Sequence, residues 1–188
     1  MPTAPMPVHL HIGDRKLAQA SGGMHDHVYP ADGSTTSRIP LAAAAETVVA
    51  VEAAADAFRS WRRSKSVERR QMLQRLAQLI RDNDAEFGRL GALDNGTPAT
   101  FATGGAHIAG EWIDYYAGWA DRIESRVNST VMADGEFGYT LAEPYGVIGV
   151  IITWNGPLIS LGMKVAPAIA AGNTVVVKLP RGTHQGEE

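Results

Sequence analysis

The chain has 188 residues, of which 45% are hydrophobic and 20% are charged, and its formal net charge is -3. This composition is typical of a globular protein with enough apolar side chains for a sizeable core. There is no block of lysine and arginine, so nothing predicts binding to nucleic acid or to an anionic membrane. No residue is cysteine, which excludes disulfides, thiolate metal sites and a thiol nucleophile within these residues.

No segment of the sequence looks like a targeting or membrane-spanning segment. The N-terminus "MPTAPMPVHL" lacks a basic start and a long apolar stretch, which argues against a secretion signal. Glycines, Asn155 and Lys164 interrupt the most apolar region before it reaches the length of a membrane span. We therefore expect a cytoplasmic protein with no membrane partner.

Residues 1–8 have no clear pattern, the following residues up to 42 predict short strands and turns, and helices are predicted from about Glu46 onwards. "HLHIGD" and "HDHVYPADGSTTSRIPLA" alternate and contain turn residues, with a tight turn expected at Asp32-Gly33. Helical periodicity starts near Glu46, and its apolar face consists of Val51, Ala54, Ala55, Phe58 and Trp61. A second helix is expected to have Ser66 as its N-cap, with an apolar face of Met72, Leu73, Leu76, Leu79 and Ile80.

Two further helical segments follow. One ends at Asn95-Gly96, which suits a left-handed C-terminal cap. The other carries an aromatic stripe at helical spacing, formed by Ile108, Trp112, Tyr115, Tyr116, Trp119 and Ile123. Such a stripe could be a stacking platform for nucleic acid, but the lack of interleaved basic residues favours an ordinary core face.

After Val127 the pattern changes from helices to strands. "TVMADGEFGYTLAEPYG" alternates around Asp134-Gly135, which predicts a hairpin. Residues 147–153 predict a strand that is buried on both faces. A helix follows from Pro157 to a cap at Gly172, bent or split at Pro167, and then a strand over residues 174–178. Strand, helix and strand form one βαβ unit, so the fold class is α/β.

Two polar residues stand at the expected carboxyl ends of these strands, where open α/β sheets bind ligands. The amide of Asn155 could donate a hydrogen bond to an oxyanion, or it could simply cap the next helix. Lys178 could reach a ribose or a phosphate, or it could simply point to water. Trp154 could wall a cofactor groove or belong to the core or its rim.

Other familiar binding motifs are weak or missing. His9 with His11, and His25 with His27, are spaced as metal ligands in a strand could be, but neither pair has a convincing third ligand, and we expect no metal site. The sequence contains neither G-x-x-x-x-G-K-[ST] nor G-x-G-x-x-G after a strand, so the usual Rossmann phosphate turn is not supported.

Together, "EPYGVIGVIITWNGPL" and "APAIAAGNTVVVK" closely resemble the start of the cofactor domain in the NAD(P)-dependent aldehyde dehydrogenase superfamily. "AAADAFRSW", "ERRQMLQRLAQLI", "LDNGTP" and "YYAGWADRI" occur upstream in the order expected for that family. The resemblance covers roughly residues 8–178 and corresponds to the N-terminal portion of the family only.

The resemblance implies roles for individual residues. Asn155 matches the asparagine that stabilises the oxyanion formed when a cysteine attacks the aldehyde. Ile152, Thr153 and Trp154 match the segment that lines the groove for NAD or NADP, and Lys178 matches the lysine that binds the adenosine ribose or its 2′-phosphate. The family usually has proline at the position of Thr153 and a bulky residue at the position of Gly156, and its later glutamate on the ribose is replaced by Arg181.

The resemblance also implies an architecture. We expect N-terminal strands and the helical region of the cofactor domain over residues 1–126, the hairpin of an oligomerisation arm over residues 127–143, and the first, incomplete βαβ unit of a Rossmann-like NAD(P)-binding sheet over residues 144–188. The family oxidises small aldehydes to carboxylic acids and forms homodimers or homotetramers.

The family's general-base glutamate and nucleophilic cysteine have no counterpart in this sequence. A covalent route through a thiolate is therefore closed to these residues alone. We expect a truncated form, for example through a frameshift, that is inactive by itself. Two alternatives are a non-catalytic module that docks onto a full-length relative and an inert truncation product.

Overall fold

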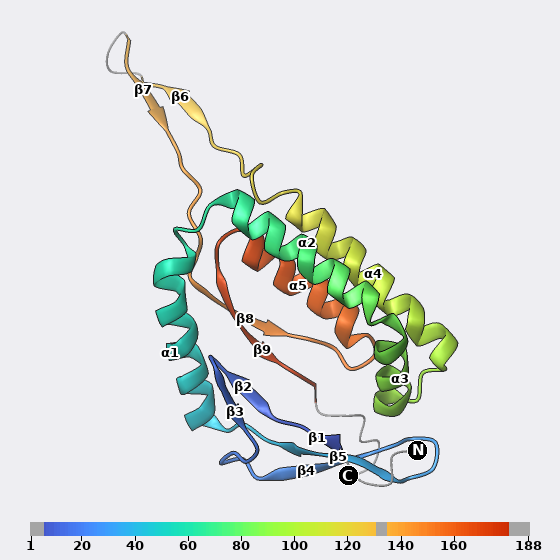
Figure 1. Cartoon of the computed structure of the whole chain (residues 1–188). Coiled ribbons are helices and arrows are strands. Elements are labelled where there is room, and N and C mark those ends of the chain that lie inside the picture. The colour runs from blue at the N-terminus through green and yellow to red at the C-terminus, as the bar shows by residue number, and fades with distance from the viewer. Residues whose placement is uncertain (1–5, 131–134, 181–188) are drawn as a thin grey trace.

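The computed structural model describes residues 6–130 and 135–180 (Figure 1). Its elements follow in the order β1 (Met6–Pro7), β2 (Leu10–Ile12), β3 (Arg15–Leu17), β4 (Met24–Val28), β5 (Thr35–Pro40), α1 (Ala44–Trp61), α2 (Ser66–Asp82), α3 (Asp84–Asn95), α4 (Ala99–Ala117), β6 (Val127–Ser129), β7 (Phe137–Tyr139), β8 (Val147–Ile151), α5 (Pro157–Ala170) and β9 (Thr174–Lys178). The α/β fold class and the order of the elements are confirmed.

The N-terminal strands form two small sheets. Strand β5 pairs in parallel with β1 and antiparallel with β4, while β2 and β3 form a separate hairpin. The predicted turn between β4 and β5 is confirmed: the Tyr29 N–H donates to the Ser34 carbonyl at 2.8 Å, and Gly33 has a φ of +73°. A left-handed φ at this position favours glycine, which explains why the Asp-Gly pair marks the turn.

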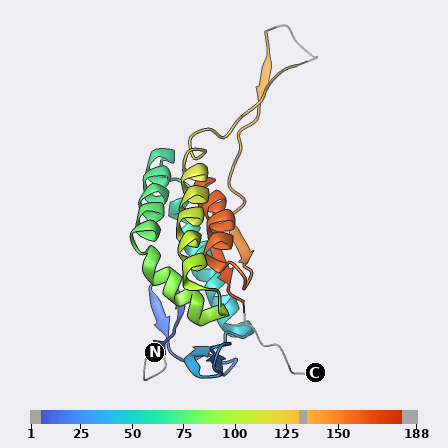
Figure 2. The same ribbon diagram turned by 90° about the vertical axis from the view of Figure 1, so that its right-hand side faces the viewer.

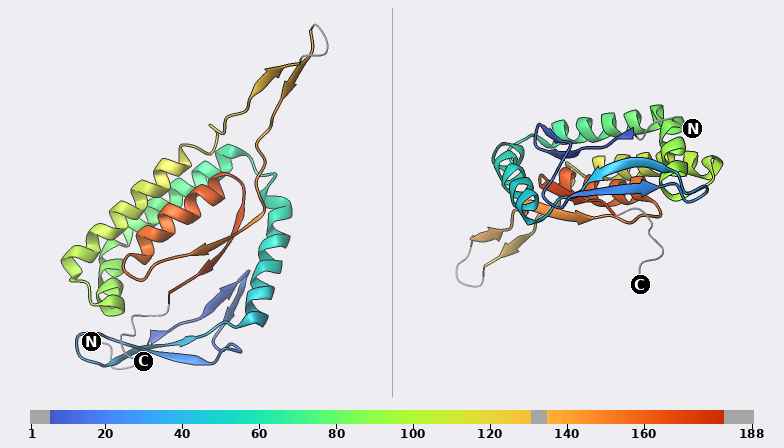
Figure 3. Two further views of the ribbon diagram at one scale, coloured as in Figure 1. Left: turned by 180° about the vertical axis from the view of Figure 1, so that it is seen from behind. Right: turned by 90° about the horizontal axis from the view of Figure 1, so that it is seen from below.

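The hydrophobic core lies where α2, α4 and α5 meet, and these helices lie side by side (Figures 1 and 3). Leu73 and Ile80 of α2 are buried as predicted, but Met72 and Leu79 on the same predicted face are about half exposed. Ser66 is the first residue of α2 rather than its N-cap, which is Lys65. The Lys65 N–H donates to the Glu68 carboxylate at 3.0 Å, so Glu68 closes this helix end.

The prediction that the aromatic stripe is a core face is wrong for most of the stripe, and only Tyr116 packs partly buried against the core. Tyr115 is 56% and Trp119 45% exposed, whereas the buried side of α4 consists of Ala106, Ala109, Ile113 and Ala117. The reason is the close approach of α5: a Cβ added at Gly162 would lie 2.9 Å from the Ala109 carbonyl oxygen. Only small side chains fit such a contact, so the large rings are excluded from the side of the helix that faces α5.

Helix α5 connects two parallel strands as the predicted βαβ unit. Strands β8 and β9 pair from Val147 opposite Thr174 to Ile151 opposite Lys178. Strand β8 ends at Ile151, which is 66% exposed, so the prediction of a strand to residue 153 that is buried on both faces is wrong. Only two strands form this sheet in the described chain, and the helices that touch it leave that side chain uncovered. Helix α5 is also continuous through Pro167 rather than split.

Helix α1 packs against β8 and β9 without burying any residue completely. The Thr174 hydroxyl donates to the Ala54 carbonyl at 2.8 Å and ties β9 to this helix. Within the predicted apolar face, Val51 and Ala55 are exposed, and Ala54, Phe58 and Trp61 are partly buried. A two-stranded sheet is too narrow to cover a whole helix face, which leaves α1 half exposed.

A two-stranded antiparallel hairpin of β6 and β7 projects from the helical body (Figures 1 and 2). Gly135, with a φ of +84°, belongs to the predicted hairpin turn, whereas Asp134 lies outside the described residues. Among the helices of the described residues, none is long and apolar enough to cross a membrane.

The burial of α2 predicts that substitutions at two neighbouring residues will change the free energy of unfolding by very different amounts. Leu73→Ala should lower the free energy of unfolding by about 2–5 kcal/mol, because it leaves a cavity at a position that is 1% exposed. Met72→Ala is the matched control, since Met72 is 53% exposed, and should change that free energy by less than about 0.5 kcal/mol. Chemical denaturation of both variants checks this, and equal losses would contradict the assigned helix face.

The contacts of Glu46 at the start of α1 should be sensitive to acid. Its carboxylate accepts hydrogen bonds from the Ser21 hydroxyl at 2.7 Å, the Ala43 N–H at 2.9 Å and the Ser21 N–H at 2.8 Å. These hydrogen bonds lower the pKa of Glu46 to about 2, and the bond from the Ser21 side chain has the largest effect. The stabilisation is present above the unfolded pKa of about 4.5 and is lost as the pH falls towards 2.

Glu46→Gln should therefore melt at a lower temperature than the wild type at pH 7, and the difference should shrink between pH 4.5 and pH 2. Thermal unfolding by circular dichroism measures both proteins across this range. Glu52→Gln, at an exposed position of the same helix, is the control. A melting difference that stays constant with pH would rule out the ionised contact.

Candidate functional site

The candidate site lies at the carboxyl ends of β8 and β9. The two strands end at the same edge, and the Ile152 N–H donates to the Lys178 carbonyl at 3.3 Å just beyond the paired residues. The chain then leaves β8 through residues 152–156 and enters α5 at Pro157. The loop between a parallel strand and the next helix is where α/β sheets place ligand-binding groups.

A pocket of about 470 Å³ opens beside this loop. Its wall is mainly apolar and comes from three parts of the chain: Ile39 of β5, Phe87 and Leu90 of α3, and Leu158 and Leu161 of α5. Ile152 and Asn155 both line it, and Ile152 is only 4% exposed. Among the predicted site residues, the fold brings these two together in one cavity.

The other predicted site residues lie outside the pocket wall. Thr153 and Trp154 are exposed in the same loop, and Trp154 is 52% exposed. Lys178 is exposed at the end of β9. The strand register therefore sets Lys178 at the same sheet edge as the loop, but on open surface rather than in the cavity.

Asn155 does not cap α5, so the capping alternative is wrong. The N-cap is Gly156, and Pro157 is the first helical residue, as predicted. In the described chain no hydrogen bond occupies the Asn155 side chain, which is exposed at the pocket wall. Its amide N–H groups are therefore available to a ligand in the pocket.

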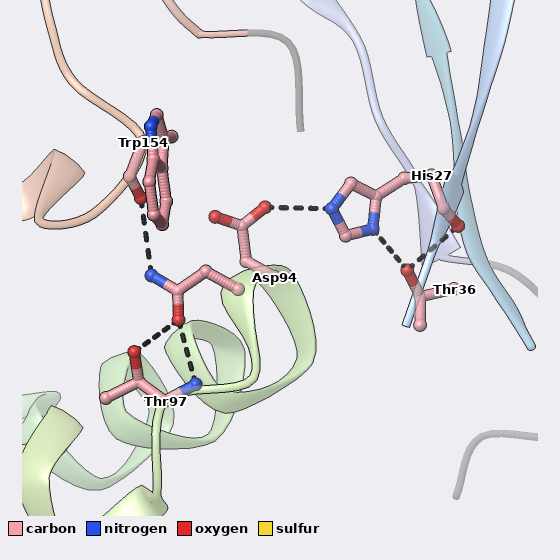
Figure 4. Close-up of polar contacts among 6 residues, drawn as sticks. His27, Thr36, Asp94, Thr97 and Trp154 are labelled. Atoms are coloured by element: carbon pink, nitrogen blue, oxygen red, sulfur yellow. Dashed lines mark hydrogen bonds and ion pairs between the residues drawn. The ribbon is translucent and has the colours of Figure 1, made fainter. Parts of the chain in front are cut away.

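A second polar group at the pocket involves residues that the sequence did not identify as a site. His27 of β4 is 4% exposed, with its Nδ1 at 2.7 Å from the Thr36 hydroxyl and its Nε2 at 3.2 Å from the Asp94 carboxylate (Figure 4). Burial raises the pKa of Asp94, and the nearby His27 partly offsets this rise. The sequence indicates His27 only as a possible metal ligand beside His25. The described residues contain no group of three side chains that could hold a metal.

Asn95 links the end of α3 to the loop that carries Asn155. Its side-chain Nδ2 donates to the Trp154 carbonyl at 3.3 Å, and its Oδ1 accepts from the Thr97 N–H at 3.0 Å. The sequence predicted only a helix end at Asn95-Gly96, which is confirmed by the left-handed Gly96 with a φ of +73°. Spacing along the chain could not reveal a contact across 59 residues.

The free side chain of Asn155 leads to a stability prediction. Asn155→Ala should change the free energy of unfolding by less than about 0.5 kcal/mol, because the exposed amide stabilises nothing in the described chain. A helix N-cap would instead lose about 1 kcal/mol on the same substitution. Urea denaturation distinguishes the two, and a loss of that size would restore the capping role.

Comparisons with known proteins agree on one family. The family model described as "Aldehyde dehydrogenase family" matches residues 17–185. The chain is 36% identical over 181 residues to an aldehyde dehydrogenase of Davidiella tassiana, covering 96% of this chain and 36% of that protein. It therefore spans little more than a third of the length of this relative.

Solved structures give the same result. The chain resembles PnpE, determined in complex with nicotinamide adenine dinucleotide, with a TM-score of 0.87 and 36% identity, over 93% of this chain and 36% of that one. It also resembles 3,6-anhydro-L-galactose dehydrogenase in complex with NAP, with a TM-score of 0.88 and 28% identity, over the same shares of the two chains. From its strand order, its site loop and these matches, the chain belongs to the aldehyde dehydrogenase family.

Proposed function

We propose that the chain forms the N-terminal part of an NAD(P)+-dependent aldehyde dehydrogenase and supplies an oxyanion-binding group to its active site. The observation that carries the proposal is the unoccupied amide of Asn155 at the wall of an apolar pocket, in the loop after a parallel strand. Family membership supports the reaction class, the oxidation of an aldehyde to a carboxylic acid.

The chemistry needs a hydrogen-bond donor where negative charge develops. When a nucleophile attacks an aldehyde carbonyl, the carbonyl oxygen becomes an oxyanion, and a positioned side-chain amide stabilises that charge more than it stabilises the neutral carbonyl. The Asn155 N–H groups can do this because no protein acceptor in the described chain competes for them. When a ligand fills the pocket and displaces water, the apolar wall strengthens this interaction.

The nucleophile is not among these residues. In the family route a thiolate attacks the aldehyde carbon, and the 188 residues contain no cysteine. The thiolate and the general base must therefore come from outside the sequence described here, and Asn155 alone cannot complete the reaction.

The residue types at the sheet edge are suited to binding a nicotinamide cofactor. The buried Ile152 provides an apolar floor, the half-exposed Trp154 a flat apolar face beside Thr153, and Lys178 a cation for a ribose hydroxyl or a phosphate. The cofactor, when bound, supplies the hydride acceptor. We propose that these four residues form one side of its groove, and that either NAD+ or NADP+ is used.

The cofactor proposal can be tested by titrating the chain with NAD+ and with NADP+ in a calorimeter. Lys178→Ala should weaken binding of the preferred cofactor about tenfold or more, because it removes a charge-assisted contact. Lys16→Ala, an exposed lysine on β3, is the control and should leave the dissociation constant unchanged. No binding by the wild type, or equal affinities of the wild type and Lys178→Ala, would refute the assignment.

The missing nucleophile leads to a separate prediction. The purified 188-residue chain should produce no NADH or NADPH from any aldehyde above the background rate, because the covalent step needs a thiolate. Absorbance at the wavelength of the reduced cofactor follows this directly. Turnover at the rate of a complete enzyme would mean that another nucleophile operates.

A second candidate function is supported by the projecting hairpin. Its side chains Val127, Phe137 and Tyr139 are all more than 60% exposed, and Tyr145 beyond it is 95% exposed. Exposed apolar strands of this kind favour pairing with another chain. A non-catalytic role on a full-length relative would show as co-purification of the two proteins that is lost when Phe137 and Tyr139 are both changed to serine.

A further inference from the structure

We infer that Asn95 is a positioning residue for Asn155: it fixes the peptide plane that precedes Asn155 and so aims its amide into the pocket. The chemical meaning of this role rests on the oxyanion function proposed above, but the contact itself stands on the geometry of α3 and the loop. Asn95 touches no reacting group and acts only through the loop backbone.

The hydrogen bonds of Asn95 leave its amide only one orientation. The Thr97 N–H can only donate, so the side-chain atom at 3.0 Å from it must be the acceptor Oδ1. The Trp154 carbonyl can only accept, so the atom at 3.3 Å from it must be the donor Nδ2. The Thr97 hydroxyl also donates to Oδ1. A flipped amide would lose both main-chain contacts, and the hydroxyl does not help to choose between the two orientations because it can also accept from an amide N–H.

The Trp154 carbonyl is the point where such a contact controls Asn155. The carbonyl of Trp154 and the N–H of Asn155 belong to one planar peptide unit, so holding the carbonyl fixes the plane that leads into Asn155. The other main-chain hydrogen bonds of the loop within residues 6–130 and 135–180 lie near its two ends. The Ile152 N–H bonds to the Lys178 carbonyl before this plane, and the Ser160 N–H bonds to the Gly156 carbonyl after it.

Other contacts tie the start of the loop rather than its middle. The Lys164 ammonium of α5 donates to the Ile151 carbonyl at 2.5 Å. Among the described residues, Asn95 provides the one side-chain hydrogen bond to the main chain of residues 153–156. Thr153, Trp154 and Asn155 are exposed, so without Asn95 no packing of their side chains would hold the peptide between Trp154 and Asn155 in place.

Asn95 can serve as a tether because the end of α3 is itself held in place. The adjacent Asp94 pairs with the buried His27 of β4 at 3.2 Å (Figure 4). On the other side, Gly96 lies so close to the turn after β4 that an added Cβ would be 2.9 Å from Cγ of Pro30. The N-terminal sheet therefore supports α3, α3 supports Asn95, and Asn95 supports the loop.

The test compares Asn95→Asp with Thr97→Val in the full chain labelled with 5-fluorotryptophan. The aspartate keeps the acceptor for Thr97 but replaces the donor to Trp154 with a carboxylate oxygen, whereas the valine keeps that donor and removes only the hydroxyl contact. The chain has four tryptophans, and Trp154→Phe identifies the Trp154 fluorine signal among them.

In Asn95→Asp the Trp154 signal should shift and broaden while the other three stay in place, and in Thr97→Val all four should match the wild type. Asn95→Asp should also raise the dissociation constant for the preferred nicotinamide cofactor about 3- to 10-fold. An unchanged Trp154 signal in Asn95→Asp, an equal change in Thr97→Val, or a collapse of all four signals would each overturn the inference, the last by showing a general structural role.

The two proposals fail in different ways in this experiment. If the wild type shows no response to NAD+ or NADP+, the proposed cofactor function fails, while the comparison of the Trp154 signals still decides the role of Asn95. If the wild type binds cofactor but Asn95→Asp leaves the Trp154 signal unchanged, only the positioning role is lost.

Discussion

The close contact between α4 and α5 sets the position of the candidate site, because α5 begins at the loop that carries Asn155. Gly162 of α5 lies against the Ala109 backbone of α4, with no room for a Cβ between them. Ala106, Ala109 and Ala117 of α4 belong to the same buried cluster as Ala166 and Ala170 of α5. Helices that meet through small residues have little freedom to slide, so the start of α5 is fixed relative to the rest of the core.

This constraint extends to α2 through a buried cation. Arg69 of α2 is 9% exposed, and its Nε donates to the Ala170 carbonyl at the last turn of α5 at 2.9 Å. A guanidinium at a helix C-terminus satisfies a carbonyl that has no partner within the helix and is favoured by the helix dipole. Burial lowers the pKa of Arg69. An arginine guanidinium stays charged in proteins, so the contact is charge-assisted. Both ends of α5 are thus held: one by packing on α4, the other by Arg69.

With α5 held in place, the site brings together parts of the chain that are distant in sequence. His27 comes from the first sheet, Asp94 and Asn95 from the end of α3, and Asn155 from the segment after β8. Polar contacts join the N-terminal strands to the end of α3, through His27 and Asp94, and join the end of α3 to the loop, through Asn95 and Trp154. That arrangement gives the strands and α3 a role in the site, although the sequence indicated His27 only as a possible metal ligand and gave Asp94 no role.

The sequence alone determined the features that depend on neighbouring residues. The glycine turns at Gly33 and Gly96, the order of the elements, the βαβ unit and the place of Asn155 after a parallel strand all follow from local spacing and turn chemistry, and the family resemblance follows from motifs in order. Periodicity marks an apolar helix face without showing what packs on it, so the burial of α4 was assigned to its rings instead of its alanines. Only the tertiary structure decided that face, the length of β8, the pairing of His27 with Asp94 and the contact of Asn95 with Trp154. Each depends on which segments meet in space, and no pattern within either segment records the approach of the other.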